Sequence, residues 1–451
     1  MPKMKKLLFT TLPSNDLGLL TRSLPIATKL AERGHQVAFC NVAKAPRKLI
    51  ADAGFENLVP RHPLYYLQTE DLNPRGLYRI LSSERVKRDC GNIFNFFREL
   101  VGSVPTRFAS PTSEIWNADH AGAMVGMLNE NFVRAHCEAM LALINDYGPD
   151  TVVDFWNPFA CVATRATGTP LVTVVQADAH PASQGLIWWK EPPADLPTPV
   201  PVLNRVLAGY GLSPINKTEE LNVGDLTLVV GIPETDPLPE IADVTYVGPI
   251  LWQKDEAQLP AWFDELSQDR PVIWVYPGNP RYLPGLRTPT DSIVVVQTCT
   301  EALADEDAQV VLSTGHHPLP GEVLPLPANF QHEPYVPGLA MAERSQLMIH
   351  HGGYGSCQTG LYTGTPAVII PTFSERESNA RRVAATGAGV FILPTENRSR
   401  RKYVSPQALR AAVRRVLSDP SFTQNARRVS EKMKTYGGAT QAARLIEDFS
   451  A

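Results

Sequence analysis

A glycine-rich segment beside two adjacent histidines carries the residues whose types and spacing best suit chemistry. It reads His350-His351-Gly352-Gly353-Tyr354-Gly355-Ser356 and follows a short apolar run at 347–349. A strand that ends here, followed by a helix that begins near Ser356, would direct unpaired N–H groups and the positive end of the helix dipole toward one crevice. Glycines let the backbone approach phosphate oxygens closely, and His351 adds either a hydrogen-bond donor or a positive charge. The segment predicts a diphosphate site.

A second polar loop is expected to face the same crevice. The helix that begins near Ser356 should end at Gly364, and the apolar run 367–370 then leads into Pro371-Thr372-Phe373-Ser374-Glu375-Arg376. Because ligands bind outside the carboxyl ends of parallel strands, Glu375 and Arg376 should lie beside the first loop.

These loops need a parallel sheet to position them, and the chain shows two β/α alternations. Near the N-terminus, a strand at 6–10, a helix with apolar residues at helical spacing and a strand at 37–40 form a βαβ unit. Further strands are expected at 151–153, 170–175 and 226–230, then at 272–276, 309–313, 347–349, 367–370 and 390–393. Helices are expected at 131–145, 407–417 and 440–448. The fold class is therefore α/β, with two doubly wound Rossmann-like domains and a cleft between them.

The domain boundaries follow from composition along the chain. We expect an N-terminal domain at 1–240, a polar linker at 241–270, a C-terminal domain at 271–435, and a final helix at 436–451 that could pack back on the N-terminal domain. A chain of 451 residues suits two domains of this size.

The composition limits the kinds of binding partner and the cellular compartment that we expect for this protein. The net charge is −4 and the pI is about 6.2, with no basic block, which argues against nucleic acid and anionic membranes. The six scattered cysteines have no CxxC spacing and predict reduced thiols in the cytoplasm. No apolar run approaches the roughly 20 residues of a membrane span. We expect a monomer or a homodimer.

An ordered series of motifs resembles the GT-B glycosyltransferases, in particular family 1, the UDP-glycosyltransferase superfamily that decorates small lipophilic molecules and includes bacterial natural-product enzymes. The matching pieces are 30–37, 149–154, 247–249, 335–337, 351–366 and 379–389, in family-like order and spacing. The resemblance implies that the N-terminal domain binds the acceptor and the C-terminal domain binds the nucleotide-sugar.

The resemblance also assigns donor-binding roles. His351, Gly353, Gly355 and Ser356 would hold the diphosphate, and Asn279 would approach it from the loop after the first strand of the C-terminal domain. Tyr335 stands where the family places an aromatic residue that stacks on the base, and the Val336 backbone would read the base edge. Glu375 and Arg376 occupy the pair that contacts the sugar hydroxyls.

Two departures from the family pattern bear on the donor. Thr359 stands where a glutamate usually binds the ribose hydroxyls, which favours a dTDP-sugar over a UDP-sugar because deoxyribose has one hydroxyl fewer. Glu375-Arg376 replaces the usual Asp-Gln. This indicates an unusual or acidic sugar, or a contact from Arg376 to phosphate; the alternative is an ion pair of Arg376 with Glu377.

The third departure affects the general base. The family usually has Gly-His at the start of the first helix, and here the pair is Gly18-Leu19. We expect Asp16, on the same loop, to be the base; helix N-capping is its alternative role.

Three other polar residues are candidates near the reaction centre. Asp119 and His120 lie in the region from which a family acidic residue orients the base, although a place on a surface loop is their alternative. His180 follows a strand end and is a further candidate.

Aromatic residues and possible metal ligands complete the candidates. Trp156, Trp188 and Trp189 could line an acceptor cleft, with core packing as the alternative. Asp305-Glu306-Asp307 matches a DxD pattern but is interpreted as surface charge. The histidine pairs lack a carboxylate at ligand spacing, so we expect no metal and no cofactor, the nucleotide-sugar being a co-substrate.

The sequence therefore predicts an inverting glycosyltransferase that uses a dTDP- or UDP-sugar and a small lipophilic or aromatic acceptor. The alternative is a non-catalytic, glycosyltransferase-like auxiliary protein that keeps the fold and has lost the base. The retained glycine-rich loop argues against that alternative.

Overall fold

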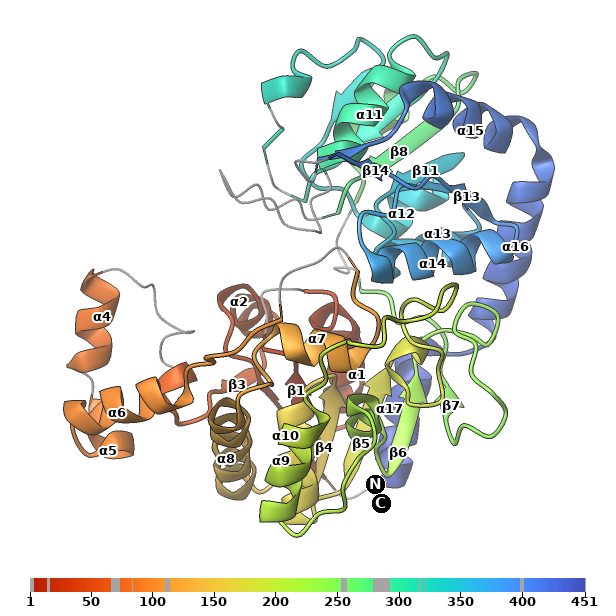
Figure 1. The fold of residues 1–451 in the computed structure, drawn as a ribbon. Coiled ribbons are helices and arrows are strands. Elements are labelled where there is room, and N and C mark those ends of the chain that lie inside the picture. The colour runs from red at the N-terminus through yellow and green to blue at the C-terminus, as the bar shows by residue number, and fades with distance from the viewer. Residues whose placement is uncertain are drawn as a thin grey trace.

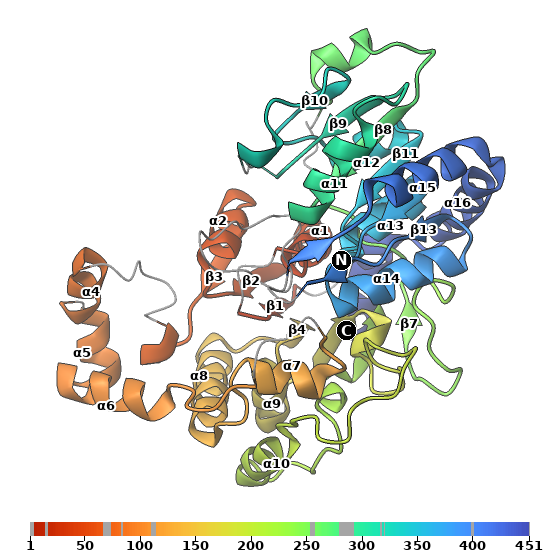
Figure 2. The same ribbon diagram turned by 45° about the horizontal axis from the view of Figure 1, so that its top comes forward.

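The chain folds into two α/β halves, each built on its own parallel sheet (Figures 1 and 2). The computed structural model describes residues 4–13, 17–65, 74–82, 84–109, 114–252, 258–278, 293–315, 318–319, 321–397 and 401–450.

The first sheet has seven strands in the order β3-β2-β1-β4-β5-β6-β7, all paired in parallel. Its strands are β1 (Lys6–Thr11), β2 (Gln36–Cys40), β3 (Glu56–Leu58), β4 (Thr151–Phe155), β5 (Leu171–Val175), β6 (Leu226–Val229) and β7 (Thr245–Tyr246). The helices of this half are α1 (Leu20–Glu32), α2 (Lys44–Asp52), α4 (Pro74–Leu81), α5 (Glu84–Cys90), α6 (Ile93–Ser103), α7 (Ala118–Met124), α8 (Glu130–Tyr147), α9 (Pro158–Thr167) and α10 (Val200–Gly209), with 3₁₀ turns η1 (Ala177–Ala179) and η2 (Thr218–Asn222).

The second sheet has six parallel strands in the order β10-β9-β8-β11-β12-β13. They are β8 (Val272–Tyr276), β9 (Gln309–Leu312), β10 (Phe330–His332), β11 (Leu347–His350), β12 (Ala367–Ile369) and β13 (Gly389–Phe391), beside a small β14 (Thr395–Glu396) and β15 (Lys402–Tyr403) hairpin. The helices and 3₁₀ turns of this half are η3 (Ala261–Glu265), α11 (Ile293–Leu303), η4 (Gly321–Val323), α12 (Gly338–Glu343), α13 (Tyr354–Thr363), α14 (Ser374–Ala385), α15 (Pro406–Ser418) and α16 (Pro420–Lys434).

Alternation along the buried strands places a hydrophobic layer on both faces of each sheet. In β1, Leu7 and Phe9 pack in one cluster with residues of α1, whereas Leu8 packs in another with residues of α8 and α9. In β8, Ile273 and Trp274 divide between the two layers of the second sheet in the same way. Helices therefore cover both faces of both sheets, which confirms the predicted pair of doubly wound, Rossmann-like halves.

The last helix, α17 (Gly438–Phe449), packs on the first sheet although it follows the second half in sequence (Figure 1). Ala442, Ala443 and Ile446 are fully buried in the same cluster as α1. On the rim, the Glu447 carboxylate pairs with Arg33 Nη1 at 2.7 Å. The chain therefore crosses between the two halves a second time.

Several short elements were not predicted from the sequence. β3, β7 and β10 have two or three residues each, too few for an apolar period to show. β7 joins the first sheet although its residues fall in the range assigned to the linker. Helices α4, α5 and α6 form an arm that projects beyond α8 at one side of the first half (Figures 1 and 2).

Candidate functional site

The glycine-rich loop lies at the carboxyl end of β11, a central strand of the second sheet flanked by β8 and β12. Gly352 has φ +87°, which L-residues rarely adopt, and Gly353 is the N-cap of α13. No side chain caps this helix end, so the first-turn N–H groups have no side-chain acceptor. The helix begins at Tyr354, two residues earlier than expected.

The His351 side chain is held between two glycines. A Cβ added at Gly278 would lie 2.7 Å from His351 Cε1, and one at Gly353 would lie 2.4 Å from His351 Nε2. The ring of Tyr276 meets the imidazole edge-on, with centroids 5.9 Å apart. The imidazole is therefore held in one position beside the N-terminus of α13.

His351 is a neutral group in this position. Burial above all, then the nearby Arg376 and His350, hold the pKa of His351 well below its usual value. Its Nδ1 is buried and has no hydrogen-bond partner among the described residues. Of the two roles left open by the sequence, neutral hydrogen bonding fits the structure, and a positive charge does not.

Helix α14 brings the second predicted loop against the first. Asn379 Nδ2 donates to Gly352 O at 3.0 Å and to Glu375 Oε1 at 2.7 Å. A Cβ at Gly352 would lie 2.7 Å from Arg376 O, so the two loops touch through backbone. The structure thus brings Glu375 and Arg376 beside the glycine-rich loop, as predicted.

Arg376 and Glu377 each contact a different partner. Arg376 Nη1 donates to Thr372 Oγ1 at 2.5 Å, and the Glu377 carboxylate pairs with Arg381 Nη2 at 2.7 Å. That pairing follows from the i, i+4 spacing of Glu377 and Arg381 on one helix face.

The remaining donor-binding candidates have different surroundings. Tyr335 follows β10 and is 40% exposed, whereas Val336 is buried. Thr359 is half-buried on α13 and its hydroxyl donates to Gly355 O at 2.8 Å. Ser356 is half-buried in the first turn of α13. Asn279 lies outside the described residues.

The opposite side of the interdomain face is formed by the start of α1. Asp16 lies outside the described residues, and Leu19 packs against the core of the first sheet. Arg22 Nε donates to Gly18 O at 3.1 Å, and its guanidinium lies 5.1 Å from the centroid of the Tyr354 ring. Helix α1 therefore meets the first residue of α13 through Arg22.

Asp119 and His120 lie at the start of α7. The Asp119 carboxylate accepts from Thr218 N at 2.8 Å and from Thr198 Oγ1 at 3.0 Å, so it holds loops of the first half together. His120 is buried, which lowers its pKa, and its Nδ1 has no partner among the described residues. Their catalytic roles stay predictions.

The three tryptophans have different surroundings. Trp188 Nε1 donates to Ser378 Oγ of α14 at 3.2 Å, and Arg381 of α14 lies 4.3 Å from the centroid of the Trp189 ring. Both indoles therefore connect the two halves. Trp156 has φ +62°, a strained conformation for a non-glycine residue, at the carboxyl end of β4. Their acceptor roles stay predictions.

A buried carboxyl group beside Trp156 was missed. Asp154, in β4, accepts from Thr10 Oγ1 at 2.5 Å, from Asn157 N at 2.9 Å and from Cys161 Sγ at 3.3 Å. Burial raises the pKa of Asp154 to about 6, although these hydrogen bonds act to lower it. An aspartate inside an apolar strand was the available signal.

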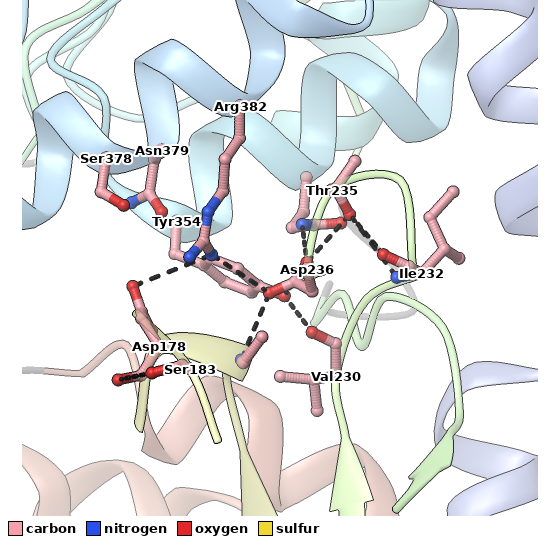
Figure 3. Close-up of polar contacts among 12 residues, drawn as sticks. Asp178, Ser183, Val230, Ile232, Thr235, Asp236, Tyr354, Ser378, Asn379 and Arg382 are labelled. Carbon is pink, nitrogen blue, oxygen red and sulfur yellow. Dashed lines mark hydrogen bonds and ion pairs between the residues drawn. The ribbon is translucent and has the colours of Figure 1, made fainter. Parts of the chain in front are cut away.

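Contacts between the halves were also missed. Tyr354 of α13 donates to Val230 O and lies 3.1 Å from Asp236 Oδ2, and Arg382 of α14 lies 3.9 Å from both Asp178 and Asp236 (Figure 3). Asp236 follows strand β6 in a proline-rich stretch. A polar residue just after a buried strand was the only sequence signal for it.

A cavity of about 220 Å³ opens in the first half, near the interface. It is lined by Trp116, Asn117, His180, Pro181, Ser183, Gln184, Gly185, Ile187, Pro192, Lys217 and Glu219. Glu219 is buried, which raises its pKa, and its Oε2 has no partner among the described residues. One residue before Trp116, Ile115 N donates to Ser374 Oγ at 2.9 Å, which brings the cavity wall to the start of α14.

Among the described residues, no three His, Cys, Asp or Glu residues gather as metal ligands, and no helix is long and apolar enough to cross a membrane. Glu306, in the DxD-like sequence, pairs with Arg410 and Arg414. His316 and His317 lie outside the described residues. Burial raises the pKa of Cys357 well above its usual value, so this thiol is inert packing.

Comparison with known proteins gives matches over most of the chain. Residues 297–448 match the family described as the erythromycin biosynthesis protein CIII-like C-terminal domain. A PGL/p-HBAD biosynthesis glycosyltransferase of Mycobacterium tuberculosis is 28% identical over 330 residues, which cover 67% of this chain and 71% of that protein. The 4'-demethylrebeccamycin synthase of Lentzea aerocolonigenes is 32% identical over 216 residues, covering 48% and 46%.

A solved structure shares the whole arrangement. The crystal structure of glycosyltransferase VinC in complex with DTDP matches with a TM-score of 0.63 and 19% identity, covering 98% of this chain and 99% of that one. At this identity the match establishes the fold, with both halves and the crossing final helix included in its coverage.

Proposed function

We propose that this chain, whose C-terminal region is like that of erythromycin biosynthesis protein CIII, is a GT-B glycosyltransferase that moves a sugar from a dTDP- or UDP-sugar to a small lipophilic or aromatic acceptor. The observation that carries the proposal is the neutral His351 imidazole held between Gly278 and Gly353 at the uncapped start of α13. Backbone N–H groups and a neutral imidazole together suit a diphosphate.

In the proposed reaction, the acceptor hydroxyl oxygen attacks the anomeric carbon from the face opposite the diphosphate. The bond from that carbon to the phosphate oxygen breaks, the configuration inverts, and the hydroxyl proton passes to a general base. Negative charge grows on the leaving diphosphate, where the α13 N-terminus, His351 and Ser356 stabilise it. Removing one such preorganised donor lowers turnover by about 10²–10³-fold in comparable sites.

For the base we propose Asp16, because Leu19 cannot accept a proton. In the sequence it falls between β1, which ends at the carboxyl edge of the first sheet, and α1. That edge faces α13 across the interface, as the Arg22–Tyr354 contact indicates.

For the acceptor we propose the cavity beside Trp116. Its wall is next to Ile115, whose amide bonds Ser374 at the start of α14, so a ring in this cavity would lie near Glu375. Trp116, Ile187 and two prolines supply apolar surface, whereas Glu219 and His180 supply acceptors for a hydroxyl group. A volume of about 220 Å³ accommodates part of an acceptor and leaves the rest at the interface.

For the nucleotide we propose dTDP before UDP, because Thr359 has no carboxylate for a second ribose hydroxyl. The dTDP complex of VinC, a protein of the same fold, supports this choice. Calorimetric titration with dTDP, UDP and GDP tests it: dTDP should bind most tightly. Thr359→Glu should shift the preference toward UDP by about 10-fold, the value of one added charge-assisted hydrogen bond. Thr359→Gln, of the same length but uncharged, is the matched control.

The rival function, a non-catalytic auxiliary protein, rests on Leu19. Turnover of a nucleotide-sugar, followed as release of the nucleoside diphosphate, separates the two. Tight nucleotide binding without any release, with or without acceptors, would favour the auxiliary role. Absence of binding by every nucleoside diphosphate tested would refute the proposed function itself.

A further inference from the structure

The first residue of the diphosphate-binding helix is anchored in the other half of the molecule. Tyr354 begins α13, directly after the glycine-rich loop, and its side chain is buried at the interface. Its hydroxyl donates to Val230 O at the end of β6 and lies 3.1 Å from Asp236 Oδ2 (Figure 3). The start of α13 is thus tied to the first sheet by one side chain.

Asp236 is the centre of this contact. Its side chain is fully buried and accepts hydrogen bonds from Thr235 Oγ1 at 2.8 Å and from Gln358 Nε2 at 3.4 Å. Gln358 lies one turn after Tyr354, so two successive turns of α13 reach the same carboxylate. Ala177 N, after β5, donates to Asp236 Oδ1 at 3.5 Å and links the contact to a second strand end of the first sheet.

The other donor-binding helix reaches the same carboxylate. Arg382 of α14 lies 3.9 Å from Asp236 Oδ1 and 3.9 Å from Asp178 Oδ2. These are ion-pair distances; among the described residues, Arg382 Nη1 has no hydrogen-bond partner. Both helices that approach the donor therefore converge on Asp236, which belongs to the acceptor half.

Gly231 shows how closely the two halves approach here. It has φ +135°, and a Cβ at this position would lie 2.1 Å from Asp236 Oδ2 and 2.9 Å from Tyr354 Oη. No larger residue fits without separating the tyrosine from the carboxylate. The contact therefore has one close-fitting geometry, which sets where the start of α13 lies relative to the first sheet.

We propose that Tyr354 and Asp236 are positioning residues for sugar transfer: they fix the start of the diphosphate-binding helix on the acceptor half, and so align the anomeric carbon with the acceptor. The inference rests on the proposed function and specifies how its two substrates are brought into register. Nucleotide binding uses groups of the second half, whereas transfer needs both halves in register. Loss of the contact should therefore lower kcat and leave nucleotide affinity nearly unchanged.

The test is Tyr354→Phe, which removes only the hydroxyl group. We expect kcat for transfer to fall about 10- to 100-fold, since misplacement by about 1 Å has effects of this size. The Kd for dTDP should stay within about 3-fold, because the backbone N–H groups of the loop are untouched. Tyr362→Phe is the matched control: the same change on the same helix, away from Asp236, should leave both values unchanged.

Gly231→Ala is the second variant, because it separates the two groups without removing either one. It should reproduce the fall in kcat at unchanged dTDP affinity, with circular dichroism verifying that the protein is folded at the assay temperature. An unchanged kcat in Tyr354→Phe would overturn the inference, and so would a dTDP affinity that falls in step with kcat. If the wild-type protein turns over no nucleotide-sugar, the proposed function fails instead, which separates the two outcomes.

Discussion

The two sides of the interdomain face achieve their chemistry in different ways. On the side of the second sheet, the site is built mainly from backbone. Glycines, an uncapped helix start and one closely packed imidazole form it within a short stretch of chain. On the side of the first sheet, every candidate is a side chain, and the candidates come from loops far apart in sequence.

This difference bears on how a substitution would affect each side. A backbone cradle depends on a few glycines and on helix geometry, so it keeps its function as long as those residues are present. A proton acceptor needs only one ionisable group at the right point, and several loops could supply it. A leucine at position 19 can therefore coexist with an intact donor site.

The largest effect is expected from the acceptor side. Asp16→Asn should lower kcat by about 10²–10⁴-fold, the usual contribution of a general base, with dTDP affinity unchanged. Steady-state transfer rates together with calorimetric titration of dTDP measure both quantities. Asp52→Asn, which removes an exposed aspartate paired with Lys48, is the matched control and should have no effect.

His180→Ala tests whether a residue of the cavity takes the proton instead of Asp16. If Asp16→Asn retains full activity while His180→Ala loses it, the proton goes to the cavity residue instead. The acceptor side would still depend on a single side chain, but the base would be His180 of the cavity instead of Asp16.

Much of the donor side could be predicted from the sequence because its determinants are local. Gly353 and Gly364 mark the two ends of α13, and the apolar runs on either side predict β11 and β12. The neutral state of His351 could not be predicted, since it depends on burial and on Arg376, which is distant in sequence.

The interface could not be predicted for the same physical reason. Asp236 meets Tyr354 across 118 positions of the chain, and no short-range pattern encodes such a pair. Trp188 and Trp189, the candidates for an acceptor cleft, stand in a loop that reaches α14 through contacts which the local sequence does not encode.

The next largest effect concerns the contact between the two sides. Arg382→Met leaves the buried Asp178 and Asp236 without their cation and should lower the free energy of unfolding by about 3–5 kcal/mol. Arg381→Met is the comparison on the same helix; its partly exposed pair with Glu377 and its contact with the Trp189 ring should together contribute about 1–2 kcal/mol, less than the buried pairs. Urea denaturation at pH 8 measures both.

The loss of stability caused by Arg382→Met should depend on pH. Burial raises the pKa of Asp236 to about 6, above its value in the unfolded chain, and Arg382 opposes this rise. The folded state therefore favours the protonated acid. As pH rises through about 6, ionisation of this buried carboxyl group lowers the free energy of unfolding. Arg382→Met should destabilise the protein less at pH 5 than at pH 8; equal losses would mean that this carboxylate does not titrate there.

A smaller effect is expected from a substitution in the glycine-rich loop. Gly353→Ala drives a methyl group into an imidazole that Gly278 prevents from retreating. Overpacking of about 1–3 kcal/mol should weaken dTDP binding by roughly 5- to 150-fold. Combining this change with His351→Ala removes the overlap, so the double variant should lose less than the sum of the two single losses.

Gly355→Ala sharpens that test. Apart from its chain neighbours and its own helix backbone, no atom of the described residues would lie within 4 Å of a Cβ at Gly355, so stability should not fall. Only a ligand that approaches this backbone would meet the methyl group. A fall in dTDP affinity at unchanged stability would locate the diphosphate beside Gly355, whereas unchanged affinity would place it elsewhere.

The smallest expected effect is a flat pH response at His351. Because burial, Arg376 and His350 hold its pKa well below the usual value, the imidazole is already neutral at pH 6.5. Affinity for a dTDP-sugar, whose diphosphate has no proton to lose in this range, should change less than about 2-fold between pH 6.5 and 8.5. His351→Gln, a neutral donor, should retain more affinity than His351→Ala. A steady loss of affinity as pH rises through 6.5 would instead mean that His351 binds as a cation, and charge would then act on both sides of the interface.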